Sequence, residues 1–294
     1  MKIAVLLFGH MRTFEQCSKS LHQNLLEKYE CDIFIHTWNV IDTNRFSQSN
    51  SEIDLSRVKN IYSPKDILVE QQKFDEDIGE YSKDENSSLK SYSVPLKGLK
   101  NMLYSMYQVN QLRVNYQIKN NIQYDYILIL RPDVYLNEDF KLEKYMKDFE
   151  FNSNTVISFC NLPSFTVTDE KMQTIYKASD LFLLFSNSSA NILFNKFNFF
   201  EKYYIEHPSK FNKFSFHPEL SFHEFIVGSS LIHRFYLFPF EVVRSNPKNN
   251  IKVISANKDI YNNVRIKDTK KYKKYFFVSL FIILILIFYI SIKF

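Results

Sequence analysis

The segment YDYILILRPDVY, at residues 124–135, is the most informative part of the sequence for predicting the fold. Four aliphatic residues at 127–130 are followed at once by Arg131, Pro132 and Asp133. A short apolar run that ends in turn signals is typical of a strand buried on both faces, as in parallel sheets. Pro132 cannot donate a ladder hydrogen bond and biases Arg131 towards extended geometry, so we expect the strand to end there.

Such a strand places Arg131 and Asp133 at its carboxyl end, where open α/β sheets bind their ligands. An arginine and an aspartate two residues apart suit a ligand that carries phosphates, with or without a divalent cation. The other interpretation is a buried strand whose polar end is simply solvated. This segment alone leaves both interpretations open.

The amino terminus repeats the pattern of an apolar run with a polar end. Residues 2–8 form the run, and the sequence GHMRTF follows at residues 9–14. Gly9 allows a tight turn and a close approach to a ligand, and Arg12 stands at the start of a helix expected over residues 15–29. A glycine turn before a basic helix start is a common way to hold an anion against backbone amides.

A third strand is expected at residues 31–38, which read CDIFIHTW. The pattern also predicts a short apolar element at 67–69, a long helix at 95–119, an aromatic helix at 191–206, and a strand pair or edge at 235–243. Residues 42–60 and 73–95 are polar and predict surface excursions. We expect the ends of the first strands to converge, which would bring Arg12 and Asp133 together.

The order of these segments resembles that of sugar-nucleotide glycosyltransferases from surface-polysaccharide clusters and large DNA viruses. The likeness rests on Gly-x-x-Arg-Thr-Phe, Asp-Ile-Phe-Ile-His-Thr-Trp and Tyr-Asp-Tyr-Ile…Arg-Pro-Asp, and continues in SDLFLLFS at residues 179–186 and HPE at residues 217–219. The resemblance implies an α/β fold of the GT-A type, with a Rossmann-related mixed sheet flanked by helices. It also implies transfer of a sugar from a nucleotide-diphosphate donor to a glycan or lipid-linked acceptor.

The resemblance also implies roles for individual residues. The ligands of the nucleotide sugar would be Gly9, His10, Arg12, Arg131 and Asp133. Asp133 would also bind a divalent cation, Mn²⁺ or Mg²⁺, but the family's Asp-x-Asp motif is here Asp133-Val134-Tyr135, with one carboxylate. One carboxylate together with substrate phosphates can hold Mg²⁺. The alternative is that Arg12 and Arg131 alone carry the charge of the diphosphate.

Two later acids are the catalytic candidates. An inverting glycosyl transfer needs a carboxylate that deprotonates the acceptor hydroxyl. Glu219 precedes a short helix expected over residues 220–226, and Asp180 starts a strong strand. Each could instead be a cap, turn or ion-pair residue. Three histidines are further candidates for metal or phosphate contacts, without a diagnostic spacing: His217, His223 and His233.

Charge and hydropathy divide the chain into a domain and a tail. The net charge is +5, and from residue 267 onwards six lysines and one aspartate account for all of it. No basic excess remains in residues 1–266 to imply a nucleic-acid partner. Residues 276–292 contain no charge, glycine or proline. As a helix they would span roughly 26 Å, close to a hydrocarbon core of about 30 Å.

The sequence therefore predicts three segments: a GT-A-like domain at 1–266, a basic juxtamembrane linker at 267–275 and a transmembrane helix at 276–292. The other interpretation of 276–292 is a buried strand or core helix. Because lysine-rich flanks stay on the cytoplasmic side, we expect a single-pass C-terminal anchor with the domain in the cytoplasm. Cys17, Cys31 and Cys160 are odd in number and widely spaced, so we expect free thiols.

Two functions fit these predictions. The first is a membrane-anchored glycosyltransferase that uses a nucleotide-diphosphate sugar. The alternative is a noncatalytic membrane-tethered protein of the same fold that binds nucleotide sugars or serves assembly. The incomplete Asp-x-Asp motif favours the alternative, whereas the presence of Arg12, Arg131, Asp133 and Glu219 favours the enzyme.

Overall fold

The computed structural model describes residues 1–41, 51–72, 96–168, 171–177, 180–196, 218–244 and 252–254. All of them belong to one compact unit, Met1–Ser255. The linker predicted at 267–275, the transmembrane helix predicted at 276–292 and His217 lie outside the described residues. Within the described ranges, no helix combines the length and the hydropathy needed to cross a membrane.

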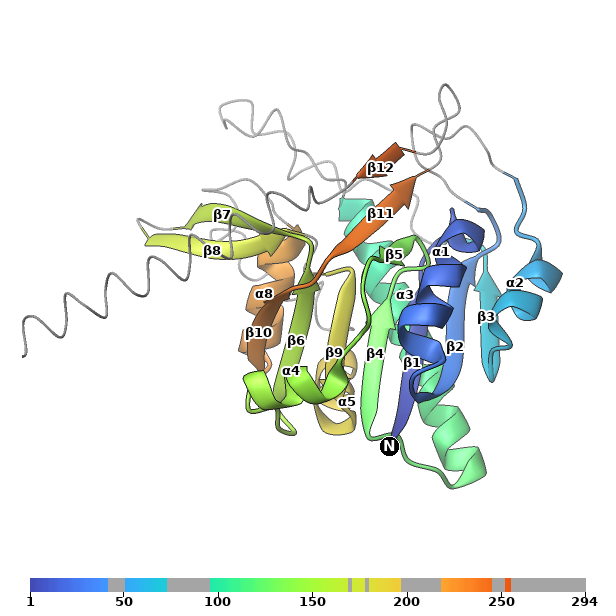
Figure 1. Cartoon of the computed structure of the whole chain (residues 1–294), viewed down its shortest axis with the longest axis horizontal. Helices are drawn as coiled ribbons and strands as arrows, with labels where there is room; N and C mark the ends of the chain where they lie inside the picture. Colours follow the sequence, from blue (N-terminus) through green and yellow to red (C-terminus); the bar gives the residue numbers. More distant parts are fainter. Residues whose placement is uncertain are drawn as a thin grey trace, which may run out of the picture. The chain divides into compact units, whose positions relative to one another are not determined.

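The centre of the fold is a seven-stranded sheet with the strand order β10-β6-β9-β4-β1-β2-β3 (Figure 1). Its strands are β1 (Lys2–Phe8), β2 (Glu30–Trp38), β3 (Asp66–Glu70), β4 (Tyr126–Leu130), β6 (Thr155–Cys160), β9 (Phe182–Ser186) and β10 (Ile232–Leu237). β9 runs antiparallel to its neighbours β4 and β6, and the other neighbouring pairs are parallel. The three strands predicted first are confirmed as neighbours, because Val5 of β1 pairs with both Ile33 and Leu128.

Helices cover both faces of this sheet, and β1 shows why. Alternate residues of a strand point to opposite faces, so Ile3, Val5 and Leu7 join one hydrophobic cluster while the intervening residues join another. The first cluster includes residues of α1 (Phe14–Leu21), α2 (Leu55–Tyr62) and α4 (Leu142–Asp148). The second includes residues of α3 (Leu96–Asn120), α5 (Asn187–Phe194) and α8 (Pro218–Gly228). A strand buried on both faces reads as a continuous apolar run, which is why β1 and β4 were recognisable. The predicted α/β fold with a mixed sheet flanked by helices is confirmed.

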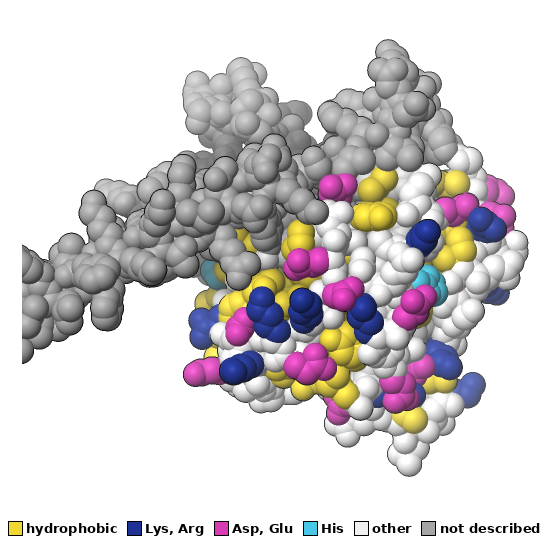
Figure 2. All heavy atoms as spheres, viewed as in Figure 1, with side chains coloured by type: hydrophobic (Ala, Val, Ile, Leu, Met, Phe, Trp, Pro, Cys, Tyr) yellow, Lys and Arg dark blue, Asp and Glu magenta, His cyan; other side chains and the backbone are white. Residues whose placement is uncertain are grey.

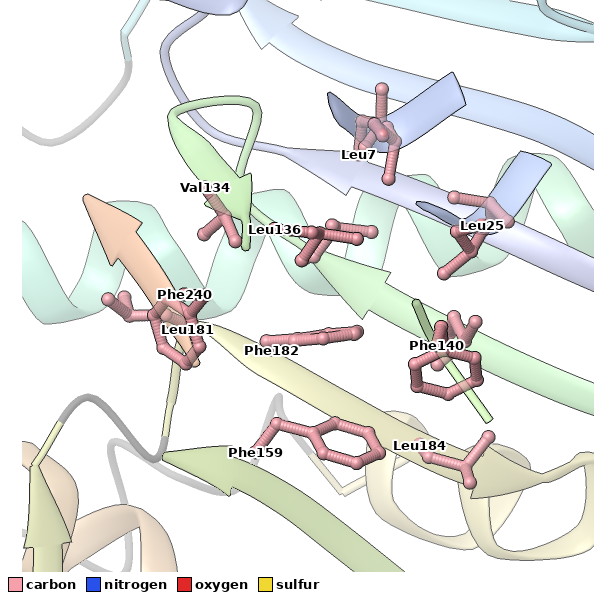
Figure 3. Close-up of a cluster of buried hydrophobic side chains, with 14 of the residues drawn as sticks. Leu7, Leu25, Val134, Leu136, Phe140, Phe159, Leu181, Phe182, Leu184 and Phe240 are labelled. Carbon is pink, nitrogen blue, oxygen red and sulfur yellow. The ribbon is translucent and has the colours of Figure 1, made fainter. Parts of the chain in front are cut away.

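Aromatic side chains fill much of the first cluster, around β6 and β9 (Figure 3). Phe159 of β6 and Phe182 of β9 have ring centroids 4.5 Å apart, and Phe140 lies 5.3 Å from Phe159. Phe240 contacts Phe182 edge-on at 6.3 Å. Because fully burying one such ring stabilises by about 1.5–3 kcal/mol, this packing anchors the strand that begins at Phe240 to the main sheet.

That strand, β11 (Phe240–Arg244), belongs to a second, smaller sheet with the order β12-β11-β5. β5 (Val134–Leu136) follows directly on the end of β4, and β12 is Lys252–Ile254. β11 pairs antiparallel with β5, with Val242 opposite Val134. A hairpin of β7 (Leu162–Thr168) and β8 (Lys171–Lys177) forms a separate two-stranded sheet. On the face seen in Figure 2, basic and acidic side chains are interspersed.

Some predicted element bounds were wrong. The helix expected over 15–29 starts at Phe14, and its last turn is a π-helix at His22–Leu26. The polar stretch 42–60 holds the start of α2, where the Asp54 carboxylate accepts from the Arg57 N–H at 3.0 Å. The helix expected at 191–206 starts earlier because Ser186 caps it, and it ends at Phe194; residues 197–206 lie outside the described ranges. The helix expected at 95–119 is α3, and the three cysteines are free, as predicted.

Candidate functional site

Three segments of the chain meet at Asp133. β1 and β4 are parallel neighbours with Leu7 opposite Leu130, so the turns that follow them leave the same edge of the sheet side by side. β11 reaches the same place from the smaller sheet, because the Val243 N–H donates to the main-chain oxygen of Asp133 at 2.9 Å. The carboxyl edge of the main sheet therefore gathers residues that are far apart in sequence.

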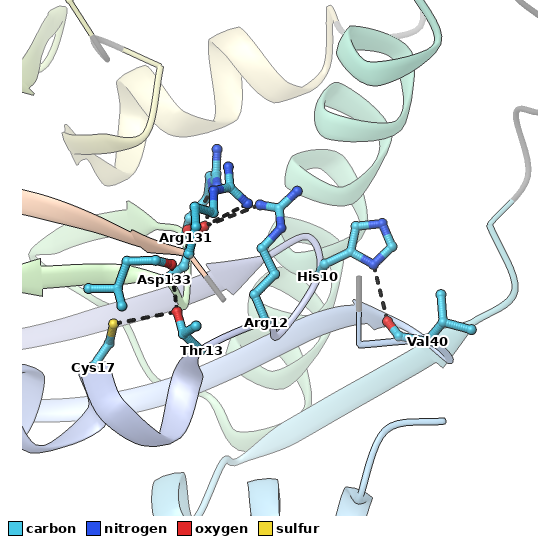
Figure 4. Close-up of polar contacts among 9 residues, drawn as sticks. His10, Arg12, Thr13, Cys17, Val40, Arg131 and Asp133 are labelled. Atoms are coloured by element: carbon cyan, nitrogen blue, oxygen red, sulfur yellow. Dashed lines mark hydrogen bonds and ion pairs between the residues drawn. The ribbon is translucent and has the colours of Figure 1, made fainter. Parts of the chain in front are cut away.

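The Asp133 carboxylate is fully buried and is shared by three arginines, which we call the arginine cluster: Arg12, Arg131 and Arg244. Arg131 donates from Nε to Oδ1 at 2.9 Å and from Nη2 to Oδ2. Arg244 Nη1 lies 3.0 Å from Oδ2, and Arg12 Nη1 donates to the same oxygen at 3.3 Å. Figure 4 shows Arg12 and Arg131 reaching Asp133 from different segments. The expectation that Arg12 and Asp133 come together is confirmed.

The charge of this cluster favours an anion. Burial raises the pKa of the Asp133 carboxyl, but the charges of Arg131, Arg244 and Arg12 outweigh it and hold that pKa well below its usual range. Three guanidinium groups and one carboxylate give the four side chains a formal charge of +2. The planar forks of the three arginines match the oxygens of phosphates and carboxylates.

The turn that presents Arg12 has an unusual backbone. Gly9 has φ +87°, which glycine adopts freely, but Arg12 has φ +47°, which costs a non-glycine residue about 1 kcal/mol or more. Contacts on both sides hold the turn in place. The Gly9 N–H donates to Ser105 Oγ at 2.7 Å, and Thr13 Oγ1 donates to the Val243 carbonyl at 2.7 Å. The guanidinium of Arg12 is thus aimed by the backbone.

A buried polar chain lies behind this turn. Ser105 Oγ, which accepts from the Gly9 N–H, is 2.7 Å from His36 Nδ1, and His36 Nε2 is 3.0 Å from Glu70 Oε2. Tyr104 donates to the same carboxylate oxygen at 2.9 Å. The chain links the ends of β2 and β3 to α3 and fixes the position of Gly9.

His10 points away from the arginine cluster (Figure 4). Its Nδ1 donates to the Val40 carbonyl at 3.1 Å, and its ring packs at a tilt against Trp38 with centroids 6.4 Å apart. The side chain is largely buried. The structure thus gives His10 a packing role beside the turn, and its contact with a nucleotide sugar stays a prediction.

The two catalytic candidates lie in different parts of the described chain. Asp180 is buried just before β9. The carbonyl of the next residue, Leu181, accepts a hydrogen bond from the Arg131 N–H at 3.1 Å, so Asp180 lies at the same edge of the sheet as the arginine cluster. Glu219 is in the first turn of α8, and its side chain is outside what the structure describes. α8 ends shortly before β10 begins and packs on it, which directs its first turn towards the carboxyl edge.

Asp133 is the predicted metal ligand, and its surroundings are those of an ion-paired group. Both carboxylate oxygens are engaged by guanidinium groups. Tyr135 stands where the motif's second carboxylate would be, and it is exposed. Among the described residues, no three His, Cys, Asp or Glu side chains come together in a group that could hold a metal ion.

Arg244 was missed by the sequence prediction, which ended the last strand at residue 243. It is the final residue of β11 and supplies one of the three charges on Asp133. The signal was present, because a cation directly after a partly apolar strand is the same pattern that identified Arg131. Nothing in the sequence indicated that β11 would pair with β5 and so bring the two arginines together.

The first half of the chain matches one family model, described as "Domain of unknown function (DUF7796)", over residues 1–159. No curated protein matches the chain. Among solved structures, it is similar to a nucleoside-diphosphate-sugar pyrophosphorylase from Vibrio cholerae RC9, with 11% identity over 81% of this chain and 92% of that one and a TM-score of 0.35.

Two glycosyltransferases are similar at the same level. One is involved in the glycosylation of the major capsid of PBCV-1, with 10% identity over 81% of this chain and 82% of that one and a TM-score of 0.35. The other is GlyE of Streptococcus pneumoniae TIGR4 in its apo form, with 12% identity over 79% of this chain and 44% of that one and a TM-score of 0.36. Likeness at these values assigns no activity. The family model, in contrast, covers more than half of the residues, and the chain therefore belongs to the family described as "Domain of unknown function (DUF7796)".

Proposed function

We propose that this chain is a glycosyltransferase that binds a nucleotide-diphosphate sugar at the carboxyl edge of its main sheet and transfers the sugar to a glycan or lipid-linked acceptor. The observation that carries the proposal is the arginine cluster around buried Asp133. The order of the sequence motifs, which resembles that of sugar-nucleotide glycosyltransferases, supports the same assignment.

The arginine cluster suits the leaving group of such a transfer. When the bond between the anomeric carbon and the diphosphate oxygen breaks, its electron pair goes to the nucleoside diphosphate, which gains negative charge. Preformed cations aimed at developing charge lower the barrier because they need no rearrangement during the reaction. Asp133 holds Arg131 and Arg244 in place before any substrate binds, so the cost of orienting them is met in folding.

The acceptor side needs a base. In an inverting transfer, a carboxylate takes the proton of the acceptor hydroxyl as its oxygen bonds to the anomeric carbon. We assign this role first to Asp180, since it lies at the same edge as Arg131. Glu219 is the second candidate, on the first turn of α8.

The tail completes the proposal. We propose that residues 276–292 anchor the chain in a membrane and that lysines at 267–274 keep the domain on the cytoplasmic side. The support is the apolar run and its basic flank in the sequence. Such an anchor would hold the site beside lipid-linked or membrane-associated acceptors.

The test is a binding and turnover screen of the full-length chain against nucleotide-diphosphate sugars. Arg131→Ala should weaken donor binding about tenfold or more, because a charge-assisted hydrogen bond contributes about 1.5–3 kcal/mol. Asp180→Asn and Glu219→Gln should both bind the donor within about twofold of the wild-type affinity. Whichever of these two residues is the base, its variant should lose sugar transfer.

The possible outcomes separate the two functions. Donor binding without transfer or hydrolysis of any nucleotide sugar would support the noncatalytic alternative. If no nucleotide sugar or nucleoside diphosphate binds, the proposal is wrong.

A further inference from the structure

The resemblance to GT-A glycosyltransferases implies a divalent cation at the Asp-x-Asp motif, and the residues of this chain can be tested against it. Mg²⁺ and Mn²⁺ take oxygen ligands, Mg²⁺ in near-octahedral geometry at about 2.1 Å. The motif here offers one carboxylate, Asp133, whose side chain is fully buried. Tyr135, in the second position, brings no carboxylate.

The oxygens of Asp133 are also already occupied. Arg131 engages both of them, and Arg244 and Arg12 approach Oδ2 at 3.0 and 3.3 Å. A divalent cation bound there would lie next to three like charges or would have to displace them. Elsewhere in the described part of the chain, no group of three acidic, histidine or cysteine side chains offers a replacement. The residues present do not fit the metal that the resemblance implies.

They fit a different task. Asp133 fixes the arginines through its side chain and fixes β11 through its main chain, where its carbonyl accepts from the Val243 N–H at 2.9 Å. Thr13 donates to the carbonyl of the same Val243 at 2.7 Å, which ties the turn that carries Arg12 to β11. One aspartate therefore sets the relative positions of three guanidinium groups from three segments.

The charges of the two partners also match. A nucleotide-diphosphate sugar carries one negative charge on each phosphate near neutral pH, since both are diesters. The arginine cluster and Asp133 together carry a formal charge of +2. The formal charge of these four side chains is equal and opposite to that of the diphosphate.

We infer that Arg12, Arg131 and Arg244 hold the donor diphosphate without a divalent cation, and that Asp133 is a positioning residue for these arginines and not a metal ligand. The inference rests on the proposed function and deepens it. It names Arg244 as a ligand of the diphosphate and gives arginines the role that a metal ion would otherwise have.

Calorimetry on the purified full-length chain tests the inference, with UDP and GDP as probes, first in excess EDTA and then with Mn²⁺. We expect one of the two to bind in EDTA, with a change of less than about twofold when Mn²⁺ replaces EDTA. Arg244→Lys should weaken binding about tenfold in both conditions, because lysine keeps the charge but loses the planar fork. Arg57→Lys is the matched control, since Arg57 is an exposed arginine paired with Glu15 at 3.2 Å, and it should bind like the wild type.

Asp133 is tested by its own pair of variants, with circular dichroism to check folding. Asp133→Asn should weaken binding equally in EDTA and in Mn²⁺, and Asp133→Glu, which keeps the charge, should recover part of the loss. A metal ligand would behave differently, because its removal would abolish only the Mn²⁺-dependent part. If Asp133→Asn does not fold, the result with Arg244→Lys decides.

Each outcome has a separate meaning. Binding that appears only with Mn²⁺ would overturn the inference and leave the proposed function intact. Wild-type affinity in Arg244→Lys would also overturn it. Failure of UDP, GDP and all nucleotide sugars to bind under either condition would remove the proposed function itself.

Discussion

Replacing Asp133 by asparagine removes the carboxylate that the arginine cluster shares, and the structure sets the expected loss of stability. The side chain is fully buried, with a two-point contact to Arg131 and further ion pairs to Arg244 and Arg12. Removing one partner of a buried ion pair costs about 3–5 kcal/mol, because the other charge is left behind. The three arginine side chains are 14–23% exposed, so solvent offsets part of this cost. We expect about 3 kcal/mol.

Thermal and chemical unfolding of the variant and the wild type measure this difference. For a domain of this size, 1 kcal/mol corresponds to about 2–4 °C, so the melting temperature should fall by roughly 6–12 °C. Asp139→Asn is the control, because Asp139 pairs with Lys28 at 3.0 Å with both side chains well exposed. Exposed pairs contribute about 0–1 kcal/mol, and the control should shift little.

The pH dependence gives the same prediction a second check. The pKa of Asp133 is held well below its usual range in the folded chain, while in the unfolded chain it is near 3.9. The stabilisation is therefore complete above about pH 4 and is lost only as the pH falls below that value. A difference between wild type and variant no larger than that of the Asp139 control would refute the reasoning. So would a difference that disappears between pH 8 and pH 6.

Three further predictions follow from other parts of the chain. Burial lowers the pKa of His223 and His233, whose Nδ1 atoms are 2.9 Å apart. The free energy of unfolding should therefore be at its full value above about pH 6.5 and should fall below that pH, by up to about 1.4 kcal/mol per pH unit for each histidine. Unfolding curves of His233→Gln should show a shallower fall. Ser186→Ala removes the cap that accepts from the Ser189 N–H at 2.9 Å and should cost about 1 kcal/mol in chemical unfolding, whereas no change would mean that the cap is dispensable. Truncation after Ile266 should give a chain that binds donor but no longer floats with vesicles and works poorly on membrane-bound acceptors; continued flotation would place the anchor elsewhere.

The strands of the main sheet were predictable to different degrees. β1 and β4 are buried on both faces, so each is a nearly continuous apolar run that stands out in the sequence. β6 is equally buried but reads TVISFC, with a threonine and a serine inside it. The serine is satisfied by a partner that only the fold provides, since Ser158 Oγ lies 2.6 Å from His233 Nε2. β6 therefore lacks the continuous apolar run that marks β1 and β4.

The site shows the same limit. Arg12, Arg131 and Asp133 could be placed at one edge, because parallel neighbours end at the same side of a sheet. Arg244 joins the other arginines at Asp133 because β11 pairs with β5. These two strands are far apart in the sequence, and a local sequence pattern does not predict such a pairing. That three guanidinium groups share the Asp133 carboxylate could not be predicted either, because local sequence patterns do not show which side chains contact one another.

The antiparallel strand β9 has a consequence for how this chain is made. β4 pairs with β1 on one side and with β9 on the other, and β9 is synthesised after β5, α4, β6 and the β7–β8 hairpin. Until it emerges, one edge of the most apolar strand in the sheet has no neighbour, and such an edge is a template for pairing with another chain. The region matched by the family model, residues 1–159, stops inside β6 and omits β9 entirely. A fragment cut at that boundary would carry the exposed edge permanently and would be prone to aggregate, so the smallest piece worth expressing extends through β11.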